Sequence, residues 1–218
     1  MLVRFIIGIV FINCYNTCLA QTFLCGSQVN YHDYSYRTVQ IGDQCWFAEN
    51  LRATMNNLGE EIRIKQDKTE WAESLLEPAI TFPSDIYRDK YGVLYNYNAV
   101  LSDNICPAGW HVPNINEWAT LANHLGGWEV SGYMMKSKKG WASPNNRTNI
   151  SGFNALPGGC RDHKGIYEFE GTGAYWWSTS ISTPFIDSWF CFIDDGSNDL
   201  LRFYFFNTFG YSVRCIRD

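Results

Sequence analysis

The sequence predicts an exported α+β domain, and three observations lead to that prediction. The first twenty residues have the composition of a secretory signal peptide, and six cysteines follow them. A strong helix pattern lies near the middle of the chain. The last third alternates β-branched and aromatic residues in short runs separated by turn residues. A small sheet, one main helix with a short second helix, a long loop region and an antiparallel sheet therefore follow one another, which is an α+β order.

The N-terminus and the charge bound the class of protein. Residues 1–20 combine Arg4 with a short apolar run and small residues at the cleavage position, which predicts a signal peptide. The run is too short for a membrane span. Removing Arg4 leaves 16 basic against 22 acidic residues, a formal charge of −6, which argues against nucleic acid and anionic lipid as partners. We expect a secreted or cell-surface protein without a membrane span after cleavage, folded as one domain over residues 21–218.

The first half of the mature chain carries one hairpin signal and one weak helix signal. Residues 33–48 alternate around a Gly-Asp turn, which predicts a β-hairpin. Residues 61–78 predict a short helix that ends before Pro78. Residues 91–100, YGVLYNYNAV, are rich in residues that favour strands.

The helix signal is strongest after residue 113. Asn114 is a predicted N-cap, and Glu117 lies three residues on, as in a capping box. The apolar residues repeat at helical spacing: Trp118, Leu121, Ala122 and Leu125. Two glycines then end the helix, and a second helix is predicted over 129–136.

Strand signals dominate the C-terminal part, after a loop-rich region at 137–173. Residues 174–180 predict a strand in which Trp176 and Trp177 alternate, one pointing into the core and one out of it. Residues 188–193 and 200–206 flank DDGSND and predict a hairpin. Residues 211–218 predict the last strand.

Four groups of residues are candidates for chemistry. Cys106 and His111 resemble a nucleophile and its base, but an even set of cysteines in an exported chain favours a structural disulfide. The carboxylates of 194–199 suit calcium or a plain turn, and the turn interpretation is preferred. Asp162 with Glu168 would be a hydrolase pair, although carboxylates so close on a loop are usually solvated. The nine tryptophans suit sugar stacking but are mostly expected in the core.

The six cysteines that follow the signal sequence allow fifteen pairings, so spacing alone does not fix them. Cys215 is the natural partner of Cys106, because their bond would close a loop of about 110 residues, worth roughly 4–5 kcal/mol. The spacings match no zinc site, and we expect no metal and no cofactor.

Six stretches together resemble one family, the Fibrobacter succinogenes major paralogous domain. They are VQIGDQCWFAENLR (39–52), YGVLYNYNAV (91–100), CPAGWHVPNINEWATLANHLGG (106–127), SGFNALPGGCR (151–161), YWWSTS (175–180) and GYSVRCIRD (210–218). The match spans about residues 39–218. Its layout is similar to C-type-lectin-like and formylglycine-generating-enzyme-like domains.

The resemblance implies a fold and three disulfides. It implies a C-type-lectin-like α+β fold, in which the cysteine before the first helix pairs with the one in the last strand, Cys106 with Cys215. Cys160 and Cys191 look like additions to the family pattern, which suggests that they pair with each other. Cys25 and Cys45 are then left as the third pair. The sequence lacks the Glu-Pro-Asn and Gln-Pro-Asp triplets of calcium-dependent sugar binding.

The function expected from the sequence is a non-catalytic binding module for a glycan or a surface protein. Ligand contacts are expected in the loop region, from Arg161, Asp162, His163, Tyr167 and Glu168. One alternative is an oxidase resembling the formylglycine-generating enzymes, with a reactive cysteine pair and copper. The other is a structural matrix protein without a specific ligand.

Overall fold

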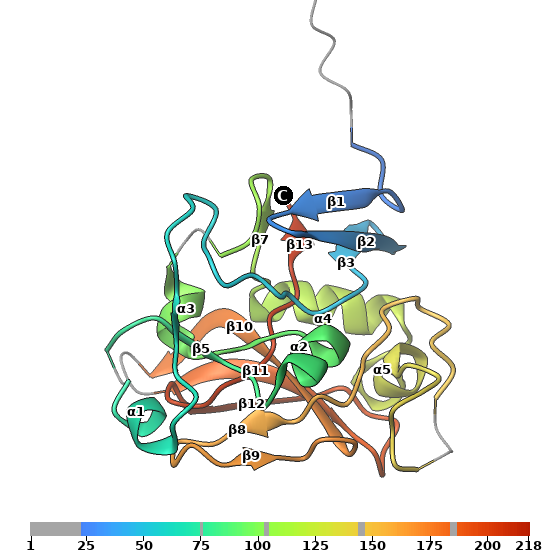
Figure 1. Ribbon diagram of the computed structural model, residues 1–218. Coiled ribbons are helices and arrows are strands. Elements are labelled where there is room, and N and C mark those ends of the chain that lie inside the picture. The colour runs from blue at the N-terminus through green and yellow to red at the C-terminus, as the bar shows by residue number, and fades with distance from the viewer. Residues whose placement is uncertain (1–22, 75, 103–104, 144–146, 184–186) are drawn as a thin grey trace, which may run out of the picture.

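The computed structural model describes residues 23–218 except 75, 103–104, 144–146 and 184–186. The predicted signal peptide lies outside the described residues. Within them the chain is a mixed α+β structure of four small sheets and five helices (Figure 1). None of the helices in this described part is long and apolar enough to cross a membrane.

A five-stranded antiparallel sheet lies at one end of the molecule, beside the C-terminus (Figure 1). Its strands in spatial order are β1 (Gln28–Tyr31), β2 (Tyr34–Ile41), β3 (Gln44–Phe47), β13 (Ile216–Arg217) and β7 (Trp110–His111). β2 and β3 form the predicted hairpin, and Gly42 in its turn has a φ of 60°, a value that glycine adopts without strain. The predicted last strand is shorter than expected, because Tyr211 and Ser212 make isolated bridges to Tyr95 and Trp176 instead of joining this sheet.

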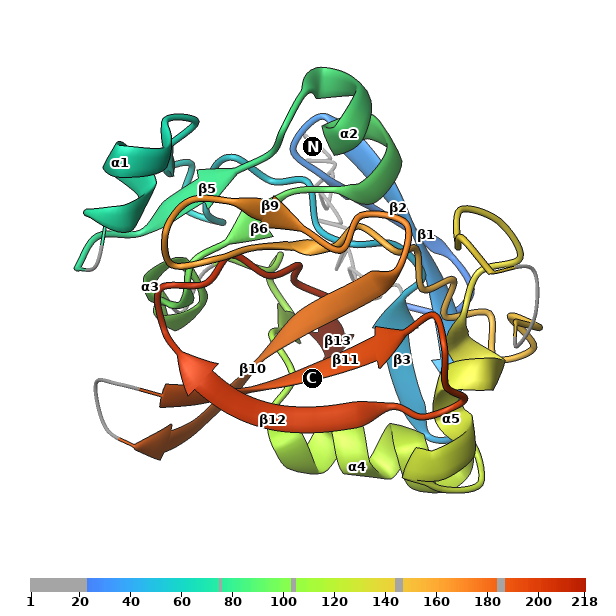
Figure 2. The ribbon, with the colours of Figure 1, turned by 90° about the horizontal axis from the view of Figure 1, so that it is seen from below.

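A second, three-stranded antiparallel sheet runs across the middle of the molecule (Figure 2). It consists of β10 (Gly173–Thr183), β11 (Asp187–Asp194) and β12 (Leu201–Phe206). This confirms the predicted strand at 174–180 and the hairpin around DDGSND. The remaining strands are short: β4 (Arg63–Ile64), β5 (Ala79–Thr81) and β6 (Leu94–Tyr95) in one sheet, and β8 (Cys160–Arg161) and β9 (Tyr167–Glu168) in another.

The helices confirm the capping signals and add two elements. The predicted helices are present as α1 (Lys68–Ala72), α4 (Ile115–His124) and α5 (Trp128–Met135), and the Asn114–Glu117 capping box is complete. Two further helices, α2 (Asp85–Tyr91) and α3 (Tyr97–Leu101), were not expected. The strand-prone segment 91–100 is strand only at β6, because the Asn96 side chain then accepts a hydrogen bond from the Ala99 amide and starts α3.

The core consists of two hydrophobic clusters, and β10 lies between them. Trp177 belongs to the cluster that contains Phe47 and Tyr95, whereas Trp176 belongs to the cluster of Trp46, Trp118 and Phe153. Both Trp176 and Trp177 are therefore fully buried, and the prediction that one of them points out of the core is wrong. Alternation along a strand separates a buried face from a solvated one only when one face of the sheet is open to water.

Two of the three expected disulfides are present. Cys106 is bonded to Cys215 and Cys25 to Cys45, which confirms both pairs. The Cys160–Cys191 pair is wrong, because both are free thiols. Cys160 lies in the cluster around Tyr95 and Cys191 in the cluster around Trp176, so the two sulfurs are buried in separate cores.

Candidate binding cleft

The predicted ligand residues at 161–168 form a small hairpin, and its Arg161 is committed to the fold. The Arg161 side chain is buried, and its guanidinium donates to the carbonyl oxygens of Lys65, Gln66 and Gly165. It also donates to Thr81 Oγ1 at 2.7 Å. All three guanidinium nitrogens thus bind the chain itself, so Arg161 is unavailable to a ligand.

The other four predicted contacts lie on the same hairpin. Asp162 Oδ1 accepts hydrogen bonds from the amides of Lys164 and Ile166 and so shapes the β8–β9 turn. The Tyr167 hydroxyl is 2.6 Å from Thr81 Oγ1. His163 packs against Phe209, and Glu168 is exposed in β9. A ligand role for Asp162, His163, Tyr167 and Glu168 stays a prediction.

The acidic turn at 194–199 surrounds a buried lysine. Asp194 Oδ1 accepts from the amides of Gly196 and Ser197, as a turn aspartate does. The Lys136 ammonium donates to the Ser197 carbonyl oxygen at 2.6 Å, and burial lowers the pKa of Lys136. In the part of the chain that the structure describes, no group of three or more His, Cys, Asp and Glu side chains could hold a metal ion.

Cys106 and His111 do not form a nucleophile and base. The Cys106 sulfur is in the disulfide to Cys215. His111 instead lies between two carboxylates, with Nε2 2.7 Å from Glu117 and Nδ1 2.5 Å from Asp218. The hydrogen bond to Glu117, with a further one to Asp218, raises the pKa of His111 to about 9. The residue is therefore an imidazolium that joins the start of α4 to the C-terminus.

The tryptophans pack inside the fold. All nine lie in the described residues and none is exposed; only Trp128 and Trp189 are half-buried. Sugar stacking on tryptophan, considered from composition, thus has little surface on which to occur.

Two adjoining cavities on another face of the molecule make up what we call the tyrosine–arginine cleft. The tyrosine chamber, about 240 Å³, is lined by Tyr31, His32, Asp33, Tyr34, Tyr36, Arg52, Ala53, Thr54, Met55, Arg88 and Asp89. The arginine chamber, about 150 Å³, is lined by Tyr34, Arg37, Glu49, Asn50, Arg52, Lys90, Tyr91, Asn154, Leu156 and Arg214. Tyr34 and Arg52 line both chambers, which together reach the lower end of the volume range of ligand pockets.

Three parts of the chain supply most of the lining of this cleft, and Tyr31–Asp33, Asn154, Leu156 and Arg214 supply the rest. β2 supplies Tyr34 and Tyr36, which lie on one face of the strand because side chains alternate. The segment that follows β3 supplies Glu49 to Met55, and α2 supplies its last turn. The amide of Arg52 donates to the Tyr36 hydroxyl at 2.9 Å, which ties the segment after β3 to β2.

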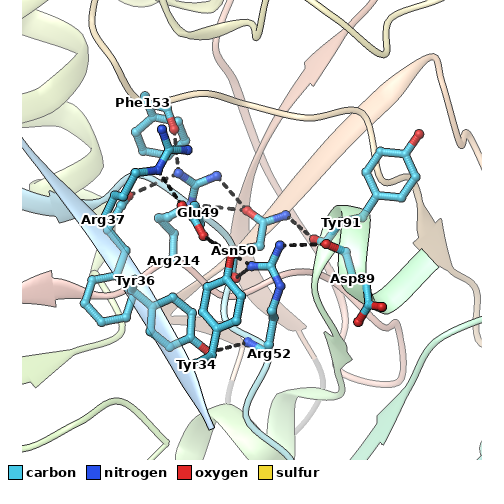
Figure 3. Close-up of polar contacts among 11 residues, drawn as sticks. Tyr34, Tyr36, Arg37, Glu49, Asn50, Arg52, Asp89, Tyr91, Phe153 and Arg214 are labelled. Carbon is cyan, nitrogen blue, oxygen red and sulfur yellow. Dashed lines mark hydrogen bonds and ion pairs between the residues drawn. The ribbon is translucent and has the colours of Figure 1, made fainter. Parts of the chain in front are cut away.

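Glu49 is held by its neighbours at the junction of the chambers (Figure 3). It accepts from the Tyr34 hydroxyl at 2.5 Å and from Arg37 Nε at 2.6 Å, and Arg52 Nη1 lies 3.6 Å away. Burial acts to raise the pKa of Glu49, but the hydrogen bonds from Tyr34 and Arg37 outweigh it and lower the pKa. Glu49 is therefore a carboxylate at neutral pH, already occupied by protein donors.

Asn50 and Arg214 form the buried floor of the arginine chamber (Figure 3). Asn50 Oδ1 accepts from Trp176 Nε1 at 2.9 Å and from Arg214 Nη2 at 2.7 Å, and its amide nitrogen donates to the Tyr91 carbonyl. Arg214 Nη1 donates to the Phe153 carbonyl at 2.6 Å. Burial lowers the pKa of Arg214 to about 9, which still leaves its guanidinium charged at neutral pH.

This cleft is not among the sites predicted from the sequence, although the sequence contains a signal for it. Five of the six stretches that carry the family resemblance meet at Asn50 and Arg214. They contribute Glu49–Asn50, Tyr91, Phe153, Trp176 and Arg214. The signal is the presence of polar residues inside motifs that are otherwise aromatic. An example is ENLR (49–52), at the end of the stretch 39–52.

Comparison with known proteins identifies a family but no individual relative. Searches of curated proteins and of solved structures found no match. The family model described as Fibrobacter succinogenes major domain matches residues 39–217, which include both halves of the Cys106–Cys215 bond and the lining of the arginine chamber apart from Tyr34 and Arg37. The chain therefore belongs to the Fibrobacter succinogenes major domain family.

Proposed function

We propose that the chain is an exported, disulfide-stabilised, non-catalytic module that binds a glycan or a protein in the tyrosine–arginine cleft. The observation that carries the proposal is the cleft itself. Its two adjoining chambers combine aromatic rings with charged side chains that a rigid buried network holds in place. Ligand pockets typically combine apolar walls with a few fixed polar groups.

The cysteines support a binding function over the oxidase alternative. A thiol that reacts with oxidants or metals needs a lowered pKa and access to solvent. Burial raises the pKa of Cys160 to about 12 and raises the pKa of Cys191 well above its ordinary value. The other four cysteines of the mature chain are in disulfides, a state that suits an extracellular protein.

A C-type-lectin-like layout is part of the same proposal. In favour of it, α4 starts directly after a proline-containing turn, and the disulfide from Cys106 ties the entrance of this helix to the C-terminal strand. Such a layout would leave the surface loops and the cleft free for recognition.

A survey of glycans and peptides with the exported protein tests the proposal. Ligands found in this way are measured again with Tyr34→Ala, which removes a wall shared by both chambers, and with Phe203→Ala, a control on the exposed face of β12. We expect a ligand whose binding falls with Tyr34→Ala and is unchanged with Phe203→Ala. A complete survey without such a ligand would favour the matrix-protein alternative.

A further inference from the structure

We propose that the arginine chamber is an anion subsite and that the ligand of the cleft is an acidic glycan, whose hexuronate carboxylate enters this chamber. The inference rests on the proposed binding function and names the class of ligand. It depends on the uneven charge of the two chambers, on an unused donor and on the strand pairing beside the cleft.

The charge of the arginine chamber is the first observation. Four cationic side chains line it, Arg37, Arg52, Lys90 and Arg214, against the single carboxylate of Glu49. Among the described residues, no carboxylate lies within ion-pair distance of Lys90 or Arg214. The protein as a whole has a formal charge of −5, so the positive charge of this chamber is a local feature. Its electrostatic potential attracts an anion and not a neutral group.

An unused hydrogen-bond donor is the second observation. Arg52 lines both chambers, and its Nη1 and Nη2 donate to the carbonyl oxygens of Asn50 and Asp89. Its Nε is buried and has no partner. A buried donor without an acceptor is unfavourable, so a small turn of the Arg52 side chain that brings Nε to a ligand oxygen in the cleft would complete the bonding of this guanidinium. Charge-assisted bonds to a carboxylate are the strongest that it could form.

The lining of the tyrosine chamber indicates that the ligand is a sugar. Its charged residues balance, Arg52 and Arg88 against Asp33 and Asp89. Tyrosine and histidine side chains line it, and aromatic rings with polar tips suit a ring that is apolar on its faces and polar at its rim. A pyranose with a carboxylate at one corner would place the neutral ring in this chamber and the charge in the next.

The strand pairing argues against an extended peptide. Peptides that bind beside a sheet commonly add a strand to a free edge. β2, which forms the wall of the cleft, is paired with β1 on one side and with β3 on the other, so its backbone groups are used. A peptide therefore cannot pair with β2, and recognition along this wall comes from its side chains.

Calorimetric titration of the exported protein with trigalacturonic acid tests the inference. Its fully methyl-esterified form is the neutral control, and an N-acetylated alanine tripeptide tests a peptide carboxylate. We expect the acid to bind about tenfold or more tightly than the ester, because the ester cannot form charge-assisted bonds. Added salt should weaken binding of the acid alone.

Three variants locate the effect. Lys90→Gln removes an exposed charge and is expected to fold normally, and Arg52→Gln removes the unused donor. Both should reduce the preference for the acid over the ester. Arg63→Gln, an exposed arginine outside the cleft, should change nothing. Equal melting temperatures identify the variants whose folds are intact.

The outcomes separate this inference from the proposed function. If acid and ester bind equally and both are lost with Tyr34→Ala, the anion subsite is refuted and the binding cleft stands. A tripeptide that binds where the acid does not would overturn the glycan class. If neither saccharide binds, the inference is overturned, and the wider ligand survey then decides the proposed function.

Discussion

Asn50 shows how one amide organises the floor of the cleft. Its oxygen accepts from Trp176 and twice from Arg214, and its nitrogen donates to Ser212 and to the Tyr91 carbonyl. A buried guanidinium without an adjacent carboxylate depends on such neutral acceptors, because desolvation of an unpaired charge is costly.

We predict that Asn50→Ala lowers the free energy of unfolding by about 3–5 kcal/mol, since it leaves the buried Arg214 cation without its main acceptor. Urea unfolding followed by tryptophan fluorescence measures the change. Asn116→Ala, an exposed asparagine in α4, is the matched control and should stay within about 0.5 kcal/mol of the parent. Similar losses in the two variants would contradict the role of Asn50.

His111 links pH to stability at the residue scale. Its folded pKa of about 9 lies above the ordinary value of 6.5, so the folded state holds the proton more tightly than the unfolded chain does. The resulting stabilisation is fully present below pH 6.5 and is lost as the pH rises through about 9. With a side chain 39% exposed, solvent screening limits it to below about 1 kcal/mol.

We therefore expect the melting temperature of the parent to fall between pH 6.5 and 9 relative to that of His111→Ala. Parallel thermal scans of the two proteins across this range give the measurement. A difference between them that does not change with pH would show that the Glu117 and Asp218 contacts leave the His111 pKa at its ordinary value.

At the scale of elements, local signals predicted more than long-range ones. The capping box of α4 and the β2–β3 and β11–β12 hairpins depend on residues within a few positions of one another, and all three are present. Pairing between distant segments left no local trace. The Cys160–Cys191 bond was predicted because both cysteines look like additions to the family pattern. That observation carries no information about their positions in space, and the two sulfurs lie in different core clusters.

The two disulfides constrain elements over very different spans. Cys106 and Cys215 are 109 residues apart, whereas Cys25 and Cys45 are 20 apart. In the chain-entropy model the longer loop is worth about 4–5 kcal/mol and the shorter about 3 kcal/mol.

We predict that replacing both Cys106 and Cys215 with alanine destabilises the fold more than replacing Cys25 and Cys45. Chemical denaturation of the two double variants gives the comparison, with the parent as reference. An unchanged midpoint for the Cys106/Cys215 variant would refute the role of this bond in holding α4 to the C-terminal strand.

For the whole molecule, the two-cluster core explains why the sequence did not point to the tyrosine–arginine cleft. β3, β10 and β11 contribute to both clusters, so their successive residues are buried on both faces and show no alternation between buried and exposed positions. The floor of the cleft is assembled from segments up to 164 residues apart, an arrangement that no pattern along the chain predicts. Ligand contacts were predicted at 161–168 because charged residues are neighbours in the sequence there, yet the Arg161 side chain is buried.

The most direct test of recognition in the tyrosine–arginine cleft is a nitrogen–proton NMR titration of the protein with trigalacturonic acid. If the acid binds in the cleft, the Arg52 Nε–H signal and the amide signals of Tyr34 and Lys90 shift with one common affinity, while those of 161–168 stay in place. Shifts confined to 161–168, or none at Arg52 Nε, would contradict recognition in this cleft.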